Sequence, residues 1–182
     1  MTLEELALQG KTNIYDSMAA GVGHRLVELR NKSIRESLSD FENIEHKLEY
    51  VSQVHGVKYI NDSKSTNVNG TWYALESMNE PVIWIAGGVD KGNDYTKILP
   101  LVAQKVKVII CLGLENTNIR NAFASIVPEI YEVKSAEDAV LMAYSLGKKG
   151  DTVLLSPACP SFDLFENYED RGNKFKEVIK QL

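Results

Sequence analysis

Cysteine and histidine are scarce in this chain, and their spacing argues against several kinds of site. Cys111 and Cys159 are the only cysteines among the 182 residues, and they form no CxxC pair. The three histidines, His24, His46 and His55, have no zinc-like spacing. We therefore expect neither a disulfide framework nor a metal site in this chain, and a reducing cytoplasm is the expected compartment.

Long apolar runs are also missing, as is a signal sequence at the start of the chain. The net charge of −5 gives no general reason to expect binding to nucleic acid or to a membrane. With 44% hydrophobic and 25% charged residues, the composition is that of a soluble globular protein. The length predicts one full domain, or one domain plus a fragment.

Three familiar active-site motifs are absent. Gly10, Lys11 and Thr12 end like a P-loop, but the required earlier glycine is replaced by Glu5. The sequence has no G-x-G-x-x-G after its first predicted strand and no G-x-S-x-G. The chain by itself is therefore not expected to be a P-loop ATPase, and the dinucleotide fingerprint is missing.

Strand and helix patterns alternate through the later two thirds of the chain. Short β-rich runs cover residues 57–61, 81–87, 106–113 and 151–157. Helical patterns lie near 68–78, 94–104, 117–126, 136–146 and 170–181, and Ser135 with Asp138 is typical of a helix start. This order predicts an α/β fold with a Rossmann-like, mainly parallel sheet and helices on both faces. Residues 48–54, joined to the first strand through His55-Gly56, predict an antiparallel hairpin at one edge.

The first forty residues differ from the rest. They contain two helical patterns, and the first carries an apolar stripe formed by Ile14, Met18, Val22, Leu26 and Leu29. Two helices do not make a core of their own. We therefore interpret residues 1–41 as the end of a neighbouring domain and residues 42–182 as the main domain. An alternative is that the stripe drives self-association.

Three polar clusters follow predicted strands: NDSKSTN (61–67), GGVDKGNDY (87–95) and SPACPSFDLF (156–165). In an open parallel sheet, ligands gather beyond the carboxyl ends of the strands. Helix starts near the first two clusters, together with Lys64 and Lys91, favour a ligand with carboxylates or phosphates. Asp62 and Asp90 could bind ribose hydroxyls, orient a lysine, or lie near a metal.

Each part of these clusters also has a purely structural interpretation. Gly87-Gly88 fits a tight turn, and Lys91 fits a solvated loop. Ser161 fits the cap of a short helix. Arg171 could tie the last helix to a carboxylate. The joint placement of all three clusters at strand ends is what favours a ligand site.

The motifs NDSKSTN, GGVDKG and LLSPACPSFDLFENYEDRG resemble those of the Mur ligase family, specifically its D-glutamate-adding branch. The resemblance extends over essentially the whole chain. It implies that residues 42–182 are the C-terminal, Rossmann-like domain of a three-domain cytoplasmic ligase. The residues before them would be the end of the central ATPase domain. The P-loop and most ligands of the catalytic Mg²⁺ would then lie outside this chain, which would be inactive alone.

The resemblance also implies a reaction and its site residues. Such ligases use ATP to convert the carboxylate of UDP-N-acetylmuramoyl-L-alanine to an acyl phosphate, which the amine of D-glutamate attacks during peptidoglycan synthesis. The positions that match D-glutamate ligands are Thr66, Lys91, Ser161, Phe162 (by its backbone) and Tyr168. Those that match nucleotide-binding residues are Asn13, Asp16, Lys47, Asp62, Lys64 and Thr66. Lys91, Asp62 and Lys64 are the positions expected to act in catalysis.

Four positions depart from the family pattern. Thr12 replaces a histidine, Asp16 an asparagine, Lys47 an arginine, and Pro160 an alanine. Lysine cannot fork or stack as arginine does. We therefore expect the adenosine contacts that the resemblance implies near Lys47 to depart further from the family pattern than the contacts to D-glutamate. We expect a monomer, with the UDP-sugar held mainly by other domains. The alternative is a stand-alone nucleotide-binding module without a ligase role.

Overall fold

The computed structural model describes residues 45–182. Thr12, Asn13 and Asp16, together with the apolar stripe between positions 14 and 29, lie outside the described residues. The domain boundary expected near positions 41–46 and the self-association through the stripe therefore stay predictions. No helix in the described part is long and apolar enough to cross a membrane.

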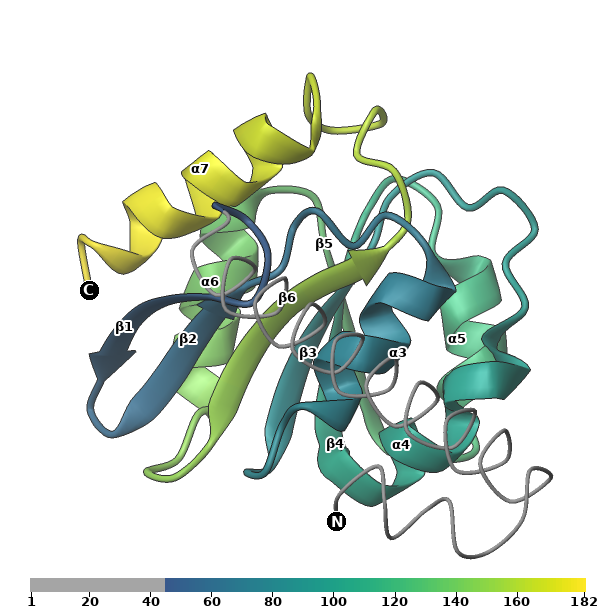
Figure 1. Cartoon of the computed structure of the whole chain (residues 1–182), viewed down its shortest axis with the longest axis horizontal. Coiled ribbons are helices and arrows are strands. Elements are labelled where there is room, and N and C mark those ends of the chain that lie inside the picture. Colours follow the sequence, from purple (N-terminus) through teal and green to yellow (C-terminus); the bar gives the residue numbers. More distant parts are fainter. Residues whose placement is uncertain (1–44) are drawn as a thin grey trace, which may run out of the picture. The chain divides into compact units, whose positions relative to one another are not determined.

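A six-stranded sheet forms the centre of the described part (Figure 1). Its strands are β1 (Glu49–Val54), β2 (Val57–Asn61), β3 (Val82–Gly87), β4 (Val106–Leu112), β5 (Glu129–Val133) and β6 (Thr152–Ala158). Their order across the sheet is β1-β2-β6-β3-β4-β5, and only the β1–β2 pair is antiparallel. The predicted edge hairpin is confirmed: its turn residues His55 and Gly56 both have positive φ, of 50° and 82°.

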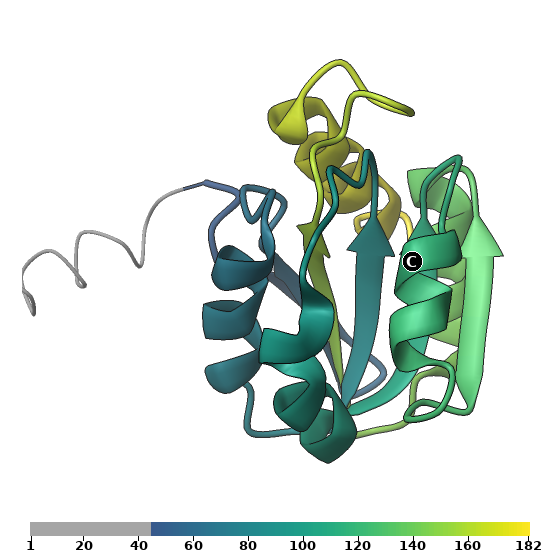
Figure 2. The same ribbon diagram turned by 90° about the vertical axis from the view of Figure 1, so that its right-hand side faces the viewer.

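Helices cover both faces of the sheet (Figures 1 and 2). They are α3 (Val68–Glu76), the 3-10 turn η1 (Tyr95–Ile98), α4 (Leu99–Lys105), α5 (Thr117–Phe123), α6 (Ala136–Leu146) and α7 (Tyr168–Ile179). Side chains of α3, η1, α4 and α5 pack with Trp84 of β3 on one face. Those of α6 and α7 pack with Ile83 and Ile85 on the other. The predicted two-faced α/β fold is therefore confirmed.

The central strands read as nearly continuous apolar runs because they are covered on both sides. Every residue of β3 and of β6 is buried, as expected for parallel strands between two helical layers. The predicted start of α6 is also confirmed, since the Ser135 side chain accepts a hydrogen bond from the Asp138 N–H (3.0 Å).

The elements at the rim of the fold differ most from expectation. No apolar pattern predicted β5, an edge strand whose Glu129 and Glu132 are exposed. Helix α7 begins at Tyr168, two residues before the predicted start, because the Asn167 side chain caps it by accepting from the Asp170 N–H (2.7 Å).

Candidate functional site

The three polar clusters meet at one edge of the sheet, as predicted. Strand β6 lies between β2 and β3, so the segments that follow these three parallel strands are neighbours at the upper edge of the sheet in Figure 1. Main-chain hydrogen bonds join them: Ala158 N donates to Ser65 O (3.1 Å), and Val89 N donates to Pro160 O (2.8 Å).

Arg171 of α7 connects all three segments. Its Nε donates to Ser63 Oγ (3.0 Å), its Nη2 to Ser63 O (2.9 Å) and its Nη1 to Cys159 O (3.1 Å), and Nη1 also lies 3.5 Å from Gly87 O. The expectation that Arg171 binds a carboxylate was wrong: its hydrogen-bond partners are a hydroxyl and main-chain carbonyls. Burial lowers the pKa of this guanidinium to about 10, so it stays charged at neutral pH.

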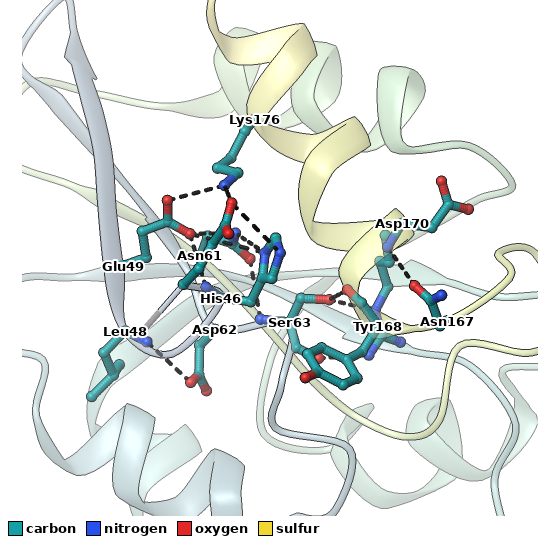
Figure 3. Close-up of polar contacts among 12 residues, drawn as sticks. His46, Leu48, Glu49, Asn61, Asp62, Ser63, Asn167, Tyr168, Asp170 and Lys176 are labelled. Atoms are coloured by element: carbon teal, nitrogen blue, oxygen red, sulfur yellow. Dashed lines mark hydrogen bonds and ion pairs between the residues drawn. The ribbon is translucent and has the colours of Figure 1, made fainter. Parts of the chain in front are cut away.

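Asp62, the first acidic residue after β2, is a buried carboxylate (Figure 3). Its Oδ2 accepts from Ser156 Oγ (2.7 Å) and its Oδ1 from the Leu48 N–H (3.2 Å). Ser156 Oγ also lies 3.1 Å from Thr71 Oγ1. Burial raises the pKa of Asp62 to about 6, although hydrogen bonds from Ser65, Ser156 and Leu48 oppose that change. A carboxyl that titrates near neutrality is typical of functional sites.

Ser161 is 2% exposed, and its hydroxyl has no hydrogen-bond partner among the described residues. The interpretation as a side-chain helix cap is therefore wrong. Instead its main-chain oxygen accepts from Leu164 N (3.2 Å) and Phe165 N (3.0 Å). Asp163 holds the same loop to the end of β4 by accepting from the Leu114 N–H (3.0 Å). Buried hydroxyls are nearly always paired, so the Ser161 hydroxyl is suited to a bound ligand.

The lysines of the site are exposed and lie in the turns that follow β2 and β3. Lys64 and Lys91 both reach solvent, where their ammonium groups can meet an anionic ligand. Asp90 closes its own loop, because its carboxylate accepts from the Gly92 and Asn93 N–H groups (2.8 and 2.9 Å). Among residues 45–182, no three His, Cys, Asp or Glu side chains are grouped so that they could hold a metal ion.

The remaining predicted site residues flank the same edge. Thr66 and Lys47 are partly exposed, and Phe162 is 69% exposed. Thr66 directly precedes Asn67, which caps α3 by accepting from the Gly70 N–H (2.9 Å). Tyr168 begins α7, and its main-chain oxygen accepts from Ser63 Oγ (2.8 Å).

Sequence reasoning did not find the interactions of His46, which lies just before β1 (Figure 3). This residue is 3% exposed, and its Nδ1 accepts from Asn61 Nδ2 (2.9 Å). A Cβ at position 172 would come within 2.2 Å of that nitrogen, so Gly172 leaves room for the imidazole. Burial lowers the pKa of His46, and it is therefore neutral at pH 7.

Comparison with known proteins identifies the family. The model for the glutamate ligase domain of Mur ligases matches residues 46–159, well over half of the chain. The chain belongs to the Mur ligase family. The match begins at His46 and ends two residues before Ser161, so the Ser161 loop and α7 lie beyond the matched segment of this Mur ligase domain.

Relatives align with the chain over its whole length. It is 57% identical over 182 residues to the UDP-N-acetylmuramoylalanine–D-glutamate ligase of Christiangramia forsetii and 51% identical to that of Porphyromonas gingivalis. All of this chain is covered in both comparisons, but only 41% and 40% of the relatives' length. Among solved structures, the bifunctional folylpolyglutamate synthase/dihydrofolate synthase of Yersinia pestis has a TM-score of 0.54 at 13% identity, covering 75% of this chain and 32% of that one. This last likeness shows a shared fold alone.

Proposed function

We propose that this Mur ligase chain contributes the amino-acid-binding domain of a UDP-N-acetylmuramoyl-L-alanine:D-glutamate ligase in peptidoglycan synthesis. The observation that carries the proposal is the buried hydroxyl of Ser161, which has no hydrogen-bond partner among residues 45–182 and lies at the edge that the Lys64 and Lys91 segments share. The relatives' names, with about half of all residues identical along the chain, support this choice of amino acid.

D-glutamate presents two carboxylates, and the edge offers donors for both. We assign Lys91 as the charged ligand of one carboxylate, with Ser161 and Thr66 as hydroxyl donors. The backbone of Phe162, an exposed residue, and the ring of Tyr168 would border the bound amino acid. Donors fixed on three separate segments can distinguish the two enantiomers because a mirror-image ligand cannot meet all of them at once.

The same edge is suited to the phosphates and ribose of ATP. Lys64 and Thr66 offer a cation and a hydroxyl, the groups that phosphates require, and Asp62 and Lys47 lie beside them. We include Asn13 and Asp16 in this set as predictions from the family pattern. ATP with Mg²⁺ would supply the phosphoryl group for an acyl phosphate on the alanine carboxylate. The D-glutamate amine would displace phosphate from it, and the chain's own residues would position the reactants.

The rest of the proposal concerns the protein's setting. We propose that it acts in the cytoplasm as a monomer, and that parts of the protein corresponding to the relatives' remaining length hold the UDP-sugar and the P-loop. A stand-alone nucleotide-binding module is the weaker alternative, because the identity to ligases runs along the entire chain.

A ligase assay on a protein of the relatives' full length that carries this sequence tests the assignment. Lys91→Ala should raise the KM for D-glutamate or abolish turnover. Lys97→Ala is the matched control, since Lys97 is also exposed and lies close by in η1. Equal kinetics for the wild type and Lys91→Ala would remove the assigned role.

A further inference from the structure

The loop that carries Lys91 is closed by a carboxylate from within the loop itself. Asp90 Oδ1 accepts from the N–H groups of Gly92 (2.8 Å) and Asn93 (2.9 Å), and the chain between them bends around Lys91. Gly92 has φ +83°, a conformation that residues with a side chain rarely adopt. The backbone of Lys91 is therefore fixed even though its side chain is exposed.

A second set of contacts joins this loop to the end of β6. Asn93 Nδ2 donates to Ala158 O (3.1 Å) and lies 3.2 Å from Cys159 Sγ. Ala158 has φ +61°, and two residues separate it from Ser161. The amide of Asn93 thus connects the lysine loop to the segment that carries the buried serine hydroxyl.

Tyr95 connects the side chains of Asp90 and Asn93 to the hydrophobic core. It is 5% exposed, and its ring packs edge-on against Phe123 with a centroid distance of 5.5 Å. Its hydroxyl donates to Asp90 Oδ2 (2.9 Å) and accepts from Asn93 Nδ2 (3.3 Å). Burial raises the pKa of this phenol well above its usual range, so the hydroxyl keeps the proton that it donates to Asp90.

We propose that Asp90, Asn93 and Tyr95 are positioning residues that set the placement of Lys91 relative to Ser161 and thereby the preference for D- over L-glutamate. The inference rests on the proposed function of this edge. It adds three residues that were not among the expected D-glutamate ligands and that hold the ligand-binding groups without touching D-glutamate. Together with Thr66, a lysine and a hydroxyl on separate loops can select one enantiomer only if their separation is fixed.

Tyr95→Phe is the decisive variant, since it removes the hydroxyl and keeps the ring against Phe123. Tyr131→Phe is the matched control: the Tyr131 hydroxyl also donates to a carboxylate, Glu129 Oε2 (3.2 Å), but on the edge strand β5. Asp90→Asn is a second variant, which weakens the acceptor for the Gly92 and Asn93 N–H groups without changing its size.

Two measurements on the full 182-residue chain test the proposal. The first is amide hydrogen exchange at Gly92 and Asn93, and the second is the ratio of the dissociation constants for D- and L-glutamate from amide-shift titrations. We expect faster exchange in Tyr95→Phe and Asp90→Asn, and a loss of about fivefold in enantiomer preference, as for one buried hydrogen bond. Tyr131→Phe should match the wild type in both.

A preference that Tyr95→Phe and Asp90→Asn retain would overturn the positioning role, whether or not exchange becomes faster. Faster exchange without a change in preference would make the network structural only. A wild-type chain that binds both enantiomers equally would instead contradict the proposed function, and the selectivity claim would fail with it. The two failures are therefore distinguishable.

Discussion

Arg171 and Ser63 are joined by two hydrogen bonds, from the guanidinium to the serine hydroxyl (3.0 Å) and to the serine carbonyl (2.9 Å). Ser63 lies between Asp62 and Lys64, so α7 fixes the turn that follows β2. Ser63 Oγ also donates to the main chain of Tyr168 (2.8 Å). The last helix and the first polar cluster of the site therefore form one hydrogen-bonded unit.

Replacing Arg171 with lysine should destabilise this unit. A lysine cannot reproduce the forked set of donors, and it would leave buried carbonyls of Ser63 or Cys159 unpaired. We expect Arg171→Lys to lower the free energy of unfolding by about 3 kcal/mol in urea denaturation. Arg120→Lys is the control: its pair with Glu132 is exposed, so the loss should stay below about 0.5 kcal/mol. Equal losses in the two variants would contradict the role of Arg171.

Asp62 should make the domain less stable as the pH rises through its titration. Its pKa is near 3.8 when unfolded and about 6 when folded, so folding disfavours the charged form. The contribution of the Asp62 carboxyl to the free energy of unfolding is fully present below pH 3.8. It falls by roughly 3 kcal/mol as the pH rises through 6.

Asp62→Asn should therefore be the more stable protein at pH 7. The amide nitrogen could donate to Ser156 Oγ, whose own proton would then turn to Thr71 Oγ1 (3.1 Å away). Urea denaturation of both proteins between pH 4 and 8 checks this, because the other carboxyl groups cancel in the difference. A constant difference in stability across that range would show that the carboxyl of Asp62 does not titrate as described.

Ser161→Ala should separate binding from stability. Its hydroxyl is buried and has no hydrogen-bond partner within residues 45–182, so its removal should not lower the free energy of unfolding. D-glutamate binding should weaken by about tenfold, the worth of one hydrogen bond to a charged group. Thermal melting and an amide-shift titration on the same samples check both parts.

Tyr59→Phe is the control for that stability argument. The Tyr59 hydroxyl is likewise buried and without a partner in the described part of the chain. Tyr59 lies within β2, however, and packs in the core on the face of the sheet covered by α6 and α7. This variant should be as stable as the wild type or more stable, with unchanged D-glutamate binding. A large loss of stability in either variant would mean that the hydroxyl has a partner.

The elements predicted from sequence alone were those with a regular signal. Strands β3 and β6 are nearly continuous apolar runs because both faces are covered, and the start of α6 has a local cap in Ser135. Strand β5 was not predicted, because this exposed edge strand contains Glu129 and Glu132 and has no apolar run.

The position of the candidate site was predictable, but its internal contacts were not. Three polar clusters after parallel strands were expected to share one edge of the sheet, and they do. The partners of Arg171 and His46 are carbonyl, hydroxyl and amide groups distant in the chain, and no local pattern identifies them. Asp90 illustrates the same limit: the sequence allowed several roles, and no local pattern indicated the hydrogen bonds that it accepts from Gly92 and Asn93.

Titration of this chain with D-glutamate, and with L-glutamate as the control, while amide shifts are recorded tests the central claim most directly. If the edge formed by the three clusters is the amino-acid site, D-glutamate should shift the amides of Thr66, Lys91 and Ser161, and L-glutamate should shift them less. Equal shifts with both enantiomers, or shifts confined to other parts of the surface, would contradict the assignment of this edge to D-glutamate.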